Sequence, residues 1–236
     1  MAMNGSVRTG NSLTEFQSRK QEYIFDTLYD ITHDRNLSRQ DFTKLQKLVT
    51  GIKGLSGRCE QSRALQTRMA SIWSGLMKSS KHYRKNPLQL HLSLPEWLSY
   101  WSDFVKAALK SHDWPASSID DHAVYDWHVE FVDFVFDVMD INSDSVIDKD
   151  DYVSSLTQFS VPEDVCLQAY SKLSTALNGE KLNRDHFRQF WFRFLVSDDP
   201  AEMGNYLFGD PTLSTKATSG DSKMTSSPWR HQQRPK

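Results

Sequence analysis

Four short segments, spread along the chain, repeat one pattern of residue types. They read NLSRQDF, HLSLPEW, VIDKDDY and KLNRDHF. In each segment an aliphatic residue precedes a residue that can cap a helix, and an aromatic residue stands four places after the cap. The caps are Ser38, Ser93, Asp148 and Asn183. Because such a side chain accepts a hydrogen bond from an otherwise unpaired N–H of the first helical turn, each segment predicts a helix start.

A stretch with helical spacing of apolar residues precedes each of these starts. The stretches are 12–30, 62–77, 124–140 and 161–177. In the first of them, Ser12 and Glu15 are expected to form a capping box. The repeating unit is therefore helix, loop, helix, and it occurs four times. The sequence predicts an all-α protein.

The third of the four loops carries a dense run of acidic residues. A helix–loop–helix unit with oxygen ligands at loop positions one, three, five, seven, nine and twelve is the EF-hand calcium site. In the third unit these positions hold Asp140, Asn142, Asp144, the backbone carbonyl of Val146, Asp148 and Asp151. Gathered carboxylates repel one another unless a cation neutralises them, and hard oxygen ligands suit Ca²⁺ or Mg²⁺. We therefore predict a calcium site here.

The first loop offers a second, weaker ligand set. Its ligands would be Asp30, Thr32, Asp34, the carbonyl of Asn36, Ser38 and Asp41. With three carboxylates it has one fewer than the third loop, and Arg35 adds an opposing charge. We expect lower affinity in this loop.

Both loops depart from the usual pattern at two positions. Position six, normally glycine because φ is positive there, holds Arg35 and Ser145. A side chain in that conformation costs about 1 kcal/mol. Position twelve holds Asp41 and Asp151 in place of the longer glutamate, so bidentate capture is harder and Mg²⁺ becomes a stronger competitor.

The second and fourth loops lack the acidic ligands. The second has Lys85, Pro87 and Gln89 at early ligand positions, and the fourth ends in His186. We predict that these two loops are structural and pair with their neighbours in short β-ladders. The expected partners are Leu37 with Leu92 and Ile147 with Leu182.

These units suggest a division of the chain into two packed pairs of hands. Residues 13–110 would form the N-terminal pair and residues 111–211 the C-terminal pair, with 1–12 and 212–236 disordered. The last 24 residues, from Leu213, hold five basic residues and one acidic residue, although the whole chain has a formal net charge of −2. The folded part is therefore acidic, which argues against nucleic-acid binding and suits a cation ligand.

With these residues in view, the chain resembles the invertebrate sarcoplasmic calcium-binding proteins, and most of all their calexcitin-like members. The resemblance runs from about Leu13 to Gly209. It is carried by the two acidic loops, by IWSGL and LPEWLSYW around the second hand, and by FWFRFLVSDDPAEMGNYLFG near the end. It implies a compact four-hand fold, calcium binding in the cytoplasm, and a role in neuronal signalling through membrane channels. Unlike this chain, family members usually keep a working second loop.

Three functions remain open at this point. The chain could be a cytoplasmic Ca²⁺/Mg²⁺ buffer or modest signal transducer, or a sensor that binds a membrane channel or another protein. It could also carry an apolar, luciferin-like molecule among its many aromatic residues, with His82, His112, His122 and His128 as polar partners. The scattered methionines favour the buffer, because sensors expose Met-rich grooves.

Other classes find no support in the sequence. There is no nucleophile elbow, Gly-rich phosphate loop or zinc spacing, so we do not expect an enzyme. The most apolar run, FVDFVFDVM, is short and interrupted by aspartates, so no membrane span is expected. We expect a monomer, with Cys59 and Cys166 as free thiols.

Overall fold

The computed structural model describes residues 13–55, 59–80, 91–110 and 126–212. Its helices are α1 (Glu15–Ile24) with a π-helical continuation (Phe25–Tyr29), α2 (Arg39–Ile52), α3 (Glu60–Ser79), α5 (Leu94–Lys110), α6 (Asp126–Met139), α7 (Lys149–Gln158), α8 (Glu163–Ala176), α9 (Arg184–Val196) and a 3-10 turn (Met203–Tyr206). Its strands are β1 (Asn36–Ser38), β2 (His91–Ser93), β3 (Val146–Ile147) and β4 (Leu182–Asn183). The all-α prediction is confirmed. The predicted disordered ends, apart from Thr212, and the first half of the second loop lie outside the described residues.

The loops pair as the sequence predicts. Strand β1 runs antiparallel to β2, and β3 runs antiparallel to β4. Their registers place Leu37 opposite Leu92 and Ile147 opposite Leu182. All four side chains are buried, so each ladder fixes its pair of loops against the core.

Helix capping follows the repeated pattern, with one correction. Ser38 and Asp148 cap α2 and α7 through complete capping boxes, and the side chain of Asn183 caps α9. At the first helix the predicted box of Ser12 and Glu15 is wrong, because Thr14 is the cap and its partner is Gln17. The helix therefore starts two residues later than the sequence indicated.

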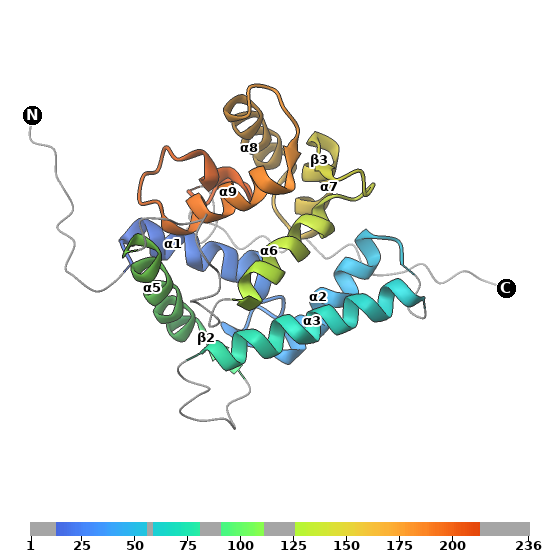
Figure 1. Ribbon diagram of the computed structural model, residues 1–236, viewed down its shortest axis with the longest axis vertical. Coiled ribbons are helices and arrows are strands. Elements are labelled where there is room, and N and C mark those ends of the chain that lie inside the picture. Colours follow the sequence, from blue (N-terminus) through green and yellow to red (C-terminus); the bar gives the residue numbers. More distant parts are fainter. Residues whose placement is uncertain (1–12, 56–58, 81–90, 111–125, 213–236) are drawn as a thin grey trace, which may run out of the picture.

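Helix α6 crosses the centre of the molecule (Figure 1). It packs against α3 on one side and against α9 on the other, so it joins the second, third and fourth hands. The α3–α6 crossing is close because Gly75 has no side chain: a Cβ there would lie 2.4 Å from the Cβ of Trp127.

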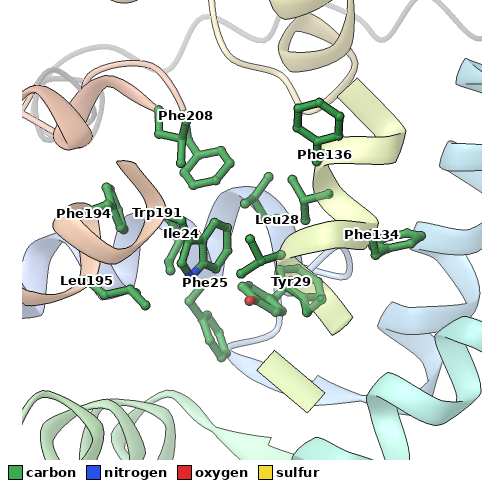
Figure 2. Packing of buried hydrophobic residues seen from close by; sticks show 14 of the residues in the cluster. Ile24, Phe25, Leu28, Tyr29, Phe134, Phe136, Trp191, Phe194, Leu195 and Phe208 are labelled. Carbon is green, nitrogen blue, oxygen red and sulfur yellow. The ribbon is translucent and has the colours of Figure 1, made fainter. Parts of the chain in front are cut away.

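The core lies where the π turn, α6 and α9 meet, as Figure 2 shows. Tyr29 stacks on Phe131 with ring centroids 4.6 Å apart, and Trp191 meets Phe208 edge-on at 5.1 Å. Phe208 belongs to the segment after α9, which is buried among these rings. The aromatic residues of the chain therefore serve mainly as core.

A tyrosine on α7 helps to hold the end of the fold. The hydroxyl of Tyr152 on α7 donates to the carbonyl of Tyr206 at 2.5 Å and accepts the N–H of Gly209 at 2.9 Å. This contact ties the segment after α9 to the exiting helix of the third hand. The C-terminal motif is thus tied to the helix that follows the third loop.

Candidate metal centre

The third loop begins with Asp140, which follows directly on α6. Its carboxylate is buried and accepts the N–H groups of Asp144 and Ser145 at 3.1 and 3.0 Å. Asn142 and Asp144 then accept loop N–H groups through their own side-chain oxygens, including that of Val146 at 3.1 Å. These bonds wrap the backbone around the carboxylates, so the ligand positions follow from the loop's own hydrogen bonding.

The far end of the loop is set by the start of α7. Asp148 accepts the N–H groups of Asp150 and Asp151 through one oxygen, at 2.9 and 3.0 Å. In return, one oxygen of Asp151 accepts the N–H of Asp148 at 3.4 Å. Capping the helix therefore also turns Asp151 back toward the beginning of the loop.

Three of the predicted side-chain ligands converge. Asp140, Asp144 and Asp151 each place a carboxylate oxygen within 4.8 Å of the others. The pKa of Asp151 is raised, first by burial and further by the charges of Asp148 and Asp140. A hard divalent cation fits this all-oxygen set, because it would remove the repulsion that raises the pKa. Val146 begins β3 beside the cluster, while Asn142 and Asp148 are engaged in loop hydrogen bonds.

The first loop is closed by its own hydroxyl groups. Both carboxylate oxygens of the buried Asp41 accept hydrogen bonds. One oxygen accepts the N–H of Thr32 at 2.9 Å and its hydroxyl at 2.7 Å. The other oxygen accepts the N–H and the hydroxyl of Ser38, both at 2.8 Å. Asp30 accepts the N–H groups of Asp34 and Arg35. An ion would have to replace the two hydroxyl bonds, which agrees with the expected weaker affinity.

In the described residues, the carboxylates of the first loop do not converge as those of the third loop do. The remaining predicted ligand position, Asn36, uses its side chain to bond the carbonyl of Asp34 at 2.9 Å. The guanidinium of Arg35 points back to Asp26 at 2.9 Å. Its charge is therefore already paired, and this reduces the repulsion that the sequence suggested.

The backbone confirms the prediction for position six. Arg35 and Ser145 have φ values of 63° and 70°. His33 and Ser143, at position four, also have positive φ, which the sequence analysis did not anticipate. Each loop thus contains two side-chain-bearing residues in the left-handed region.

Comparison with known proteins points to one group. No protein-family model matches the chain. The chain is 22% identical to sarcoplasmic calcium-binding proteins II, V, VI and VII of Branchiostoma lanceolatum, over 84% of this chain and 98% of the relative. It is also 22% identical to calexcitin-1 of Caenorhabditis elegans, over 86% of this chain and 91% of the relative. The solved structure of an amphioxus sarcoplasmic calcium-binding protein shares the fold, with a TM-score of 0.64 and 19% identity over 84% of this chain and 98% of that one.

The chain is similar to sarcoplasmic calcium-binding proteins and to calexcitin over most of its length, and it shares the EF-hand fold of the amphioxus protein. In the described residues, no helix is both long and apolar enough to cross a membrane. Cys166 is buried, Cys59 is partly exposed, and the two are not joined in a disulfide.

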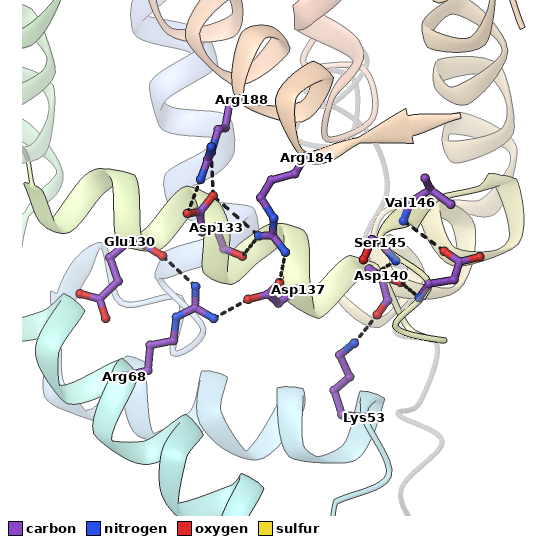
Figure 3. A network of polar contacts seen from close by, with 11 residues as sticks. Lys53, Arg68, Glu130, Asp133, Asp137, Asp140, Ser145, Val146, Arg184 and Arg188 are labelled. Atoms are coloured by element: carbon purple, nitrogen blue, oxygen red, sulfur yellow. Dashed lines mark hydrogen bonds and ion pairs between the residues drawn. The ribbon is translucent and has the colours of Figure 1, made fainter. Parts of the chain in front are cut away.

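A set of ion pairs that the sequence did not reveal anchors the EF-hand helix α6. Asp137, one turn before the loop, bonds Arg68 of α3 at 2.5 Å and Arg184 of α9 at 2.6 Å. Asp133, a turn earlier, pairs with Arg188 of α9 at 2.6 Å. Figure 3 shows these side chains side by side along α6. The entry to the third EF-hand loop is therefore fixed by two other hands.

The strain at position six of the third EF-hand loop gives a testable prediction. Ser145→Gly should stabilise the calcium-loaded protein by up to about 1 kcal/mol, because the Cβ clash is removed. Thermal unfolding with saturating Ca²⁺ should show a rise of about 2–4 °C. Ser154→Gly, at an exposed helical position in α7, is the matched control and should lower the melting temperature. An unchanged or lower melting temperature for Ser145→Gly would contradict the strain argument.

Proposed function

We propose that the chain binds Ca²⁺ in the third loop, between α6 and α7. The ligands would be Asp140, Asn142, Asp144, the carbonyl of Val146, Asp148 and Asp151. The observation that carries this proposal is the convergence of three carboxylates from one loop. Its relatives are named as calcium-binding proteins, which supports the choice of ion.

The first loop is proposed as a second, weaker site. Its six ligand positions run from Asp30 to Asp41, and its hydroxyl–carboxylate bonds oppose ion entry. Mg²⁺ should compete at both sites, because the shorter aspartate stands at position twelve. Millimolar Mg²⁺ should therefore weaken the apparent calcium affinity.

Isothermal titration tests this assignment. Calcium added to magnesium-free protein should give one tighter and one weaker binding event, and magnesium at about 1 mM should weaken both. Absence of any calcium-dependent heat, together with an unchanged melting temperature, would contradict calcium binding.

We further propose that the protein acts as a cytoplasmic, monomeric buffer or modest signal transducer. Opening a sensor-like groove at the third hand would require α6 to move. The two arginines on Asp137 oppose that motion, since each ion pair spans two helices. The core rings of α6 and α9 oppose it further: Phe136 meets Phe187 edge-on at 5.6 Å.

The sensor alternative, with a membrane channel or another protein as partner, makes a different prediction. A sensor would expose apolar surface on binding calcium, and a hydrophobic dye would report it. For the proposed buffer we expect less than about a twofold change in dye fluorescence, because the interior stays packed. A large calcium-dependent rise would favour the sensor.

The luciferin-like carrier has less support. Of the four candidate histidines, His128 lies in the described residues; it is buried, and its Nε2 accepts the N–H of Trp191. Burial lowers its pKa to about 3, so it is a neutral member of the aromatic core. The apolar cavity between Leu28 and Phe159 has a volume of about 10 Å³, which is room for a single water molecule.

A further inference from the structure

Helix α2 connects the first calcium loop with the third. Its first turn contains Asp41, the last ligand position of the first loop, and Lys53 caps its other end. The ammonium group of Lys53 donates a hydrogen bond to the backbone carbonyl of Asp140, the first residue of the third loop. Figure 3 shows this lysine reaching the loop from α2. A positive charge from another hand therefore lies at the entrance of the proposed ion site.

The charges of three carboxylates act on this ammonium group. Burial lowers the pKa of Lys53, and the charges of Asp140, Asp137 and Asp151 act against that lowering. Asp137 is already bonded to two arginines, so its charge is balanced without the lysine. The other two carboxylates belong to Asp140 and Asp151, at positions one and twelve of the third loop. Lys53 thus contacts the first residue of the ligand set, and its charge acts on both ends of that set.

We propose that Lys53 is a resident counter-ion of the third loop and sets its calcium affinity. This inference rests on the proposed calcium site. A fixed positive charge next to the carboxylates offsets their mutual repulsion before an ion enters, and it repels a divalent ion that does enter. Both effects lower the affinity for Ca²⁺ and keep the loop folded at low calcium.

The surroundings of Lys53 leave room for its side chain to move away when an ion binds. It lines a groove of about 860 Å³ between α2, α3 and the third loop, together with Arg68, Ser143 and Ser145. The groove gives the flexible side chain space to turn away from the loop while the helices stay in place. The exchange of one cation for another therefore needs no opening of the core.

Calcium titration of variants of the full chain tests this role. Lys53→Met and Lys53→Gln both remove the charge, and glutamine keeps a donor for the carbonyl of Asp140. At low salt, both should bind Ca²⁺ about three- to tenfold more tightly at the third loop than the wild type does, and about 0.5 M KCl should reduce that gain by screening. Lys53→Arg should stay within about twofold of the wild type, because it keeps the charge.

Lys47→Met is the matched control, since it removes an exposed lysine from the same helix. It should change the calcium affinity less than Lys53→Met does. Equal or weaker binding by Lys53→Gln, or an equal gain in Lys47→Met, would overturn the proposal. A wild type that binds no calcium would instead remove the proposed function itself, so the two failures are distinct.

Discussion

Asp140→Ala should abolish the tighter calcium-binding event. The substitution removes a charged ligand and leaves the N–H groups of Asp144 and Ser145 without their acceptor. Each lost charge-assisted bond is worth about 1.5–3 kcal/mol, so we expect the affinity to fall at least about 100-fold. In titration calorimetry only the weaker event of the first loop should remain.

The same variant should lose most of its stabilisation by calcium. A ligand at about 1,000 times its dissociation constant stabilises the folded state by about 4 kcal/mol, which the wild type should show as a melting temperature about 8–16 °C higher. Asp150→Ala is the matched control, since it removes an exposed carboxylate from the first turn of α7 but no predicted ligand. If Asp140→Ala kept the tighter event, or if Asp150→Ala lost it as well, the ligand assignment would be wrong.

What the sequence predicted about the fold depends on local rules. A capping residue at Asp148 and an aromatic residue at Tyr152 are separated by one helical turn, so their geometry is fixed by the helix itself. The pairing of Leu37 with Leu92 could be predicted because loop geometry is shared by the hands. The shifted start of α1 has the same origin: Ser12 and Thr14 both have side chains that can cap, and local sequence does not decide between them.

The surroundings of the two acidic loops could not be predicted in this way. Lys53 and Asp140 are 87 residues apart, and nothing near either residue indicates that they meet. The same holds for Asp137, whose two arginines come from α3 and α9. Such contacts depend on how the helices pack, and the packing is decided by the whole core. A single sequence therefore indicates the acidic loop residues better than the distant groups that contact them.

Lys20→Met should destabilise the fold by about 2–4 kcal/mol at pH 9, because acceptors around Lys20 lose the amine that donates to them. Lys20 is fully buried in α1. Its ammonium group reaches the carbonyls of Phe194 and Ser197 at 2.5 and 2.7 Å, and the side-chain oxygen of Asn205 at 3.0 Å. The first two carbonyls lie at the end of α9, where helical carbonyls have no partner within the helix and a positive charge is favourable. One lysine thus joins the first helix to the last.

The destabilisation should depend on pH in a definite direction. Burial lowers the pKa of Lys20 to about 7, against the opposing charges of Asp198 and Glu202, while in the unfolded chain it keeps its ordinary value near 10.5. Between these values the unfolded state binds more protons than the folded state, so the contribution of Lys20 to stability rises with pH by about 1.4 kcal/mol per unit. This contribution of Lys20 to stability is lost as the pH falls to about 7. Below pH 7 the contribution no longer changes with pH.

Urea unfolding at pH 6, 7, 8 and 9 provides the measurement. The difference in unfolding free energy between wild type and Lys20→Met should be flat from pH 6 to 7 and should then grow toward pH 9. Lys44→Met, an exposed lysine on α2, is the control for the loss of one charge and should show no such slope. A pH-independent difference would mean that Lys20 stays charged throughout. The hydrogen bonds to the three acceptors would then contribute more free energy than burial of the charge costs, and the lysine would cap α9 at every pH tested.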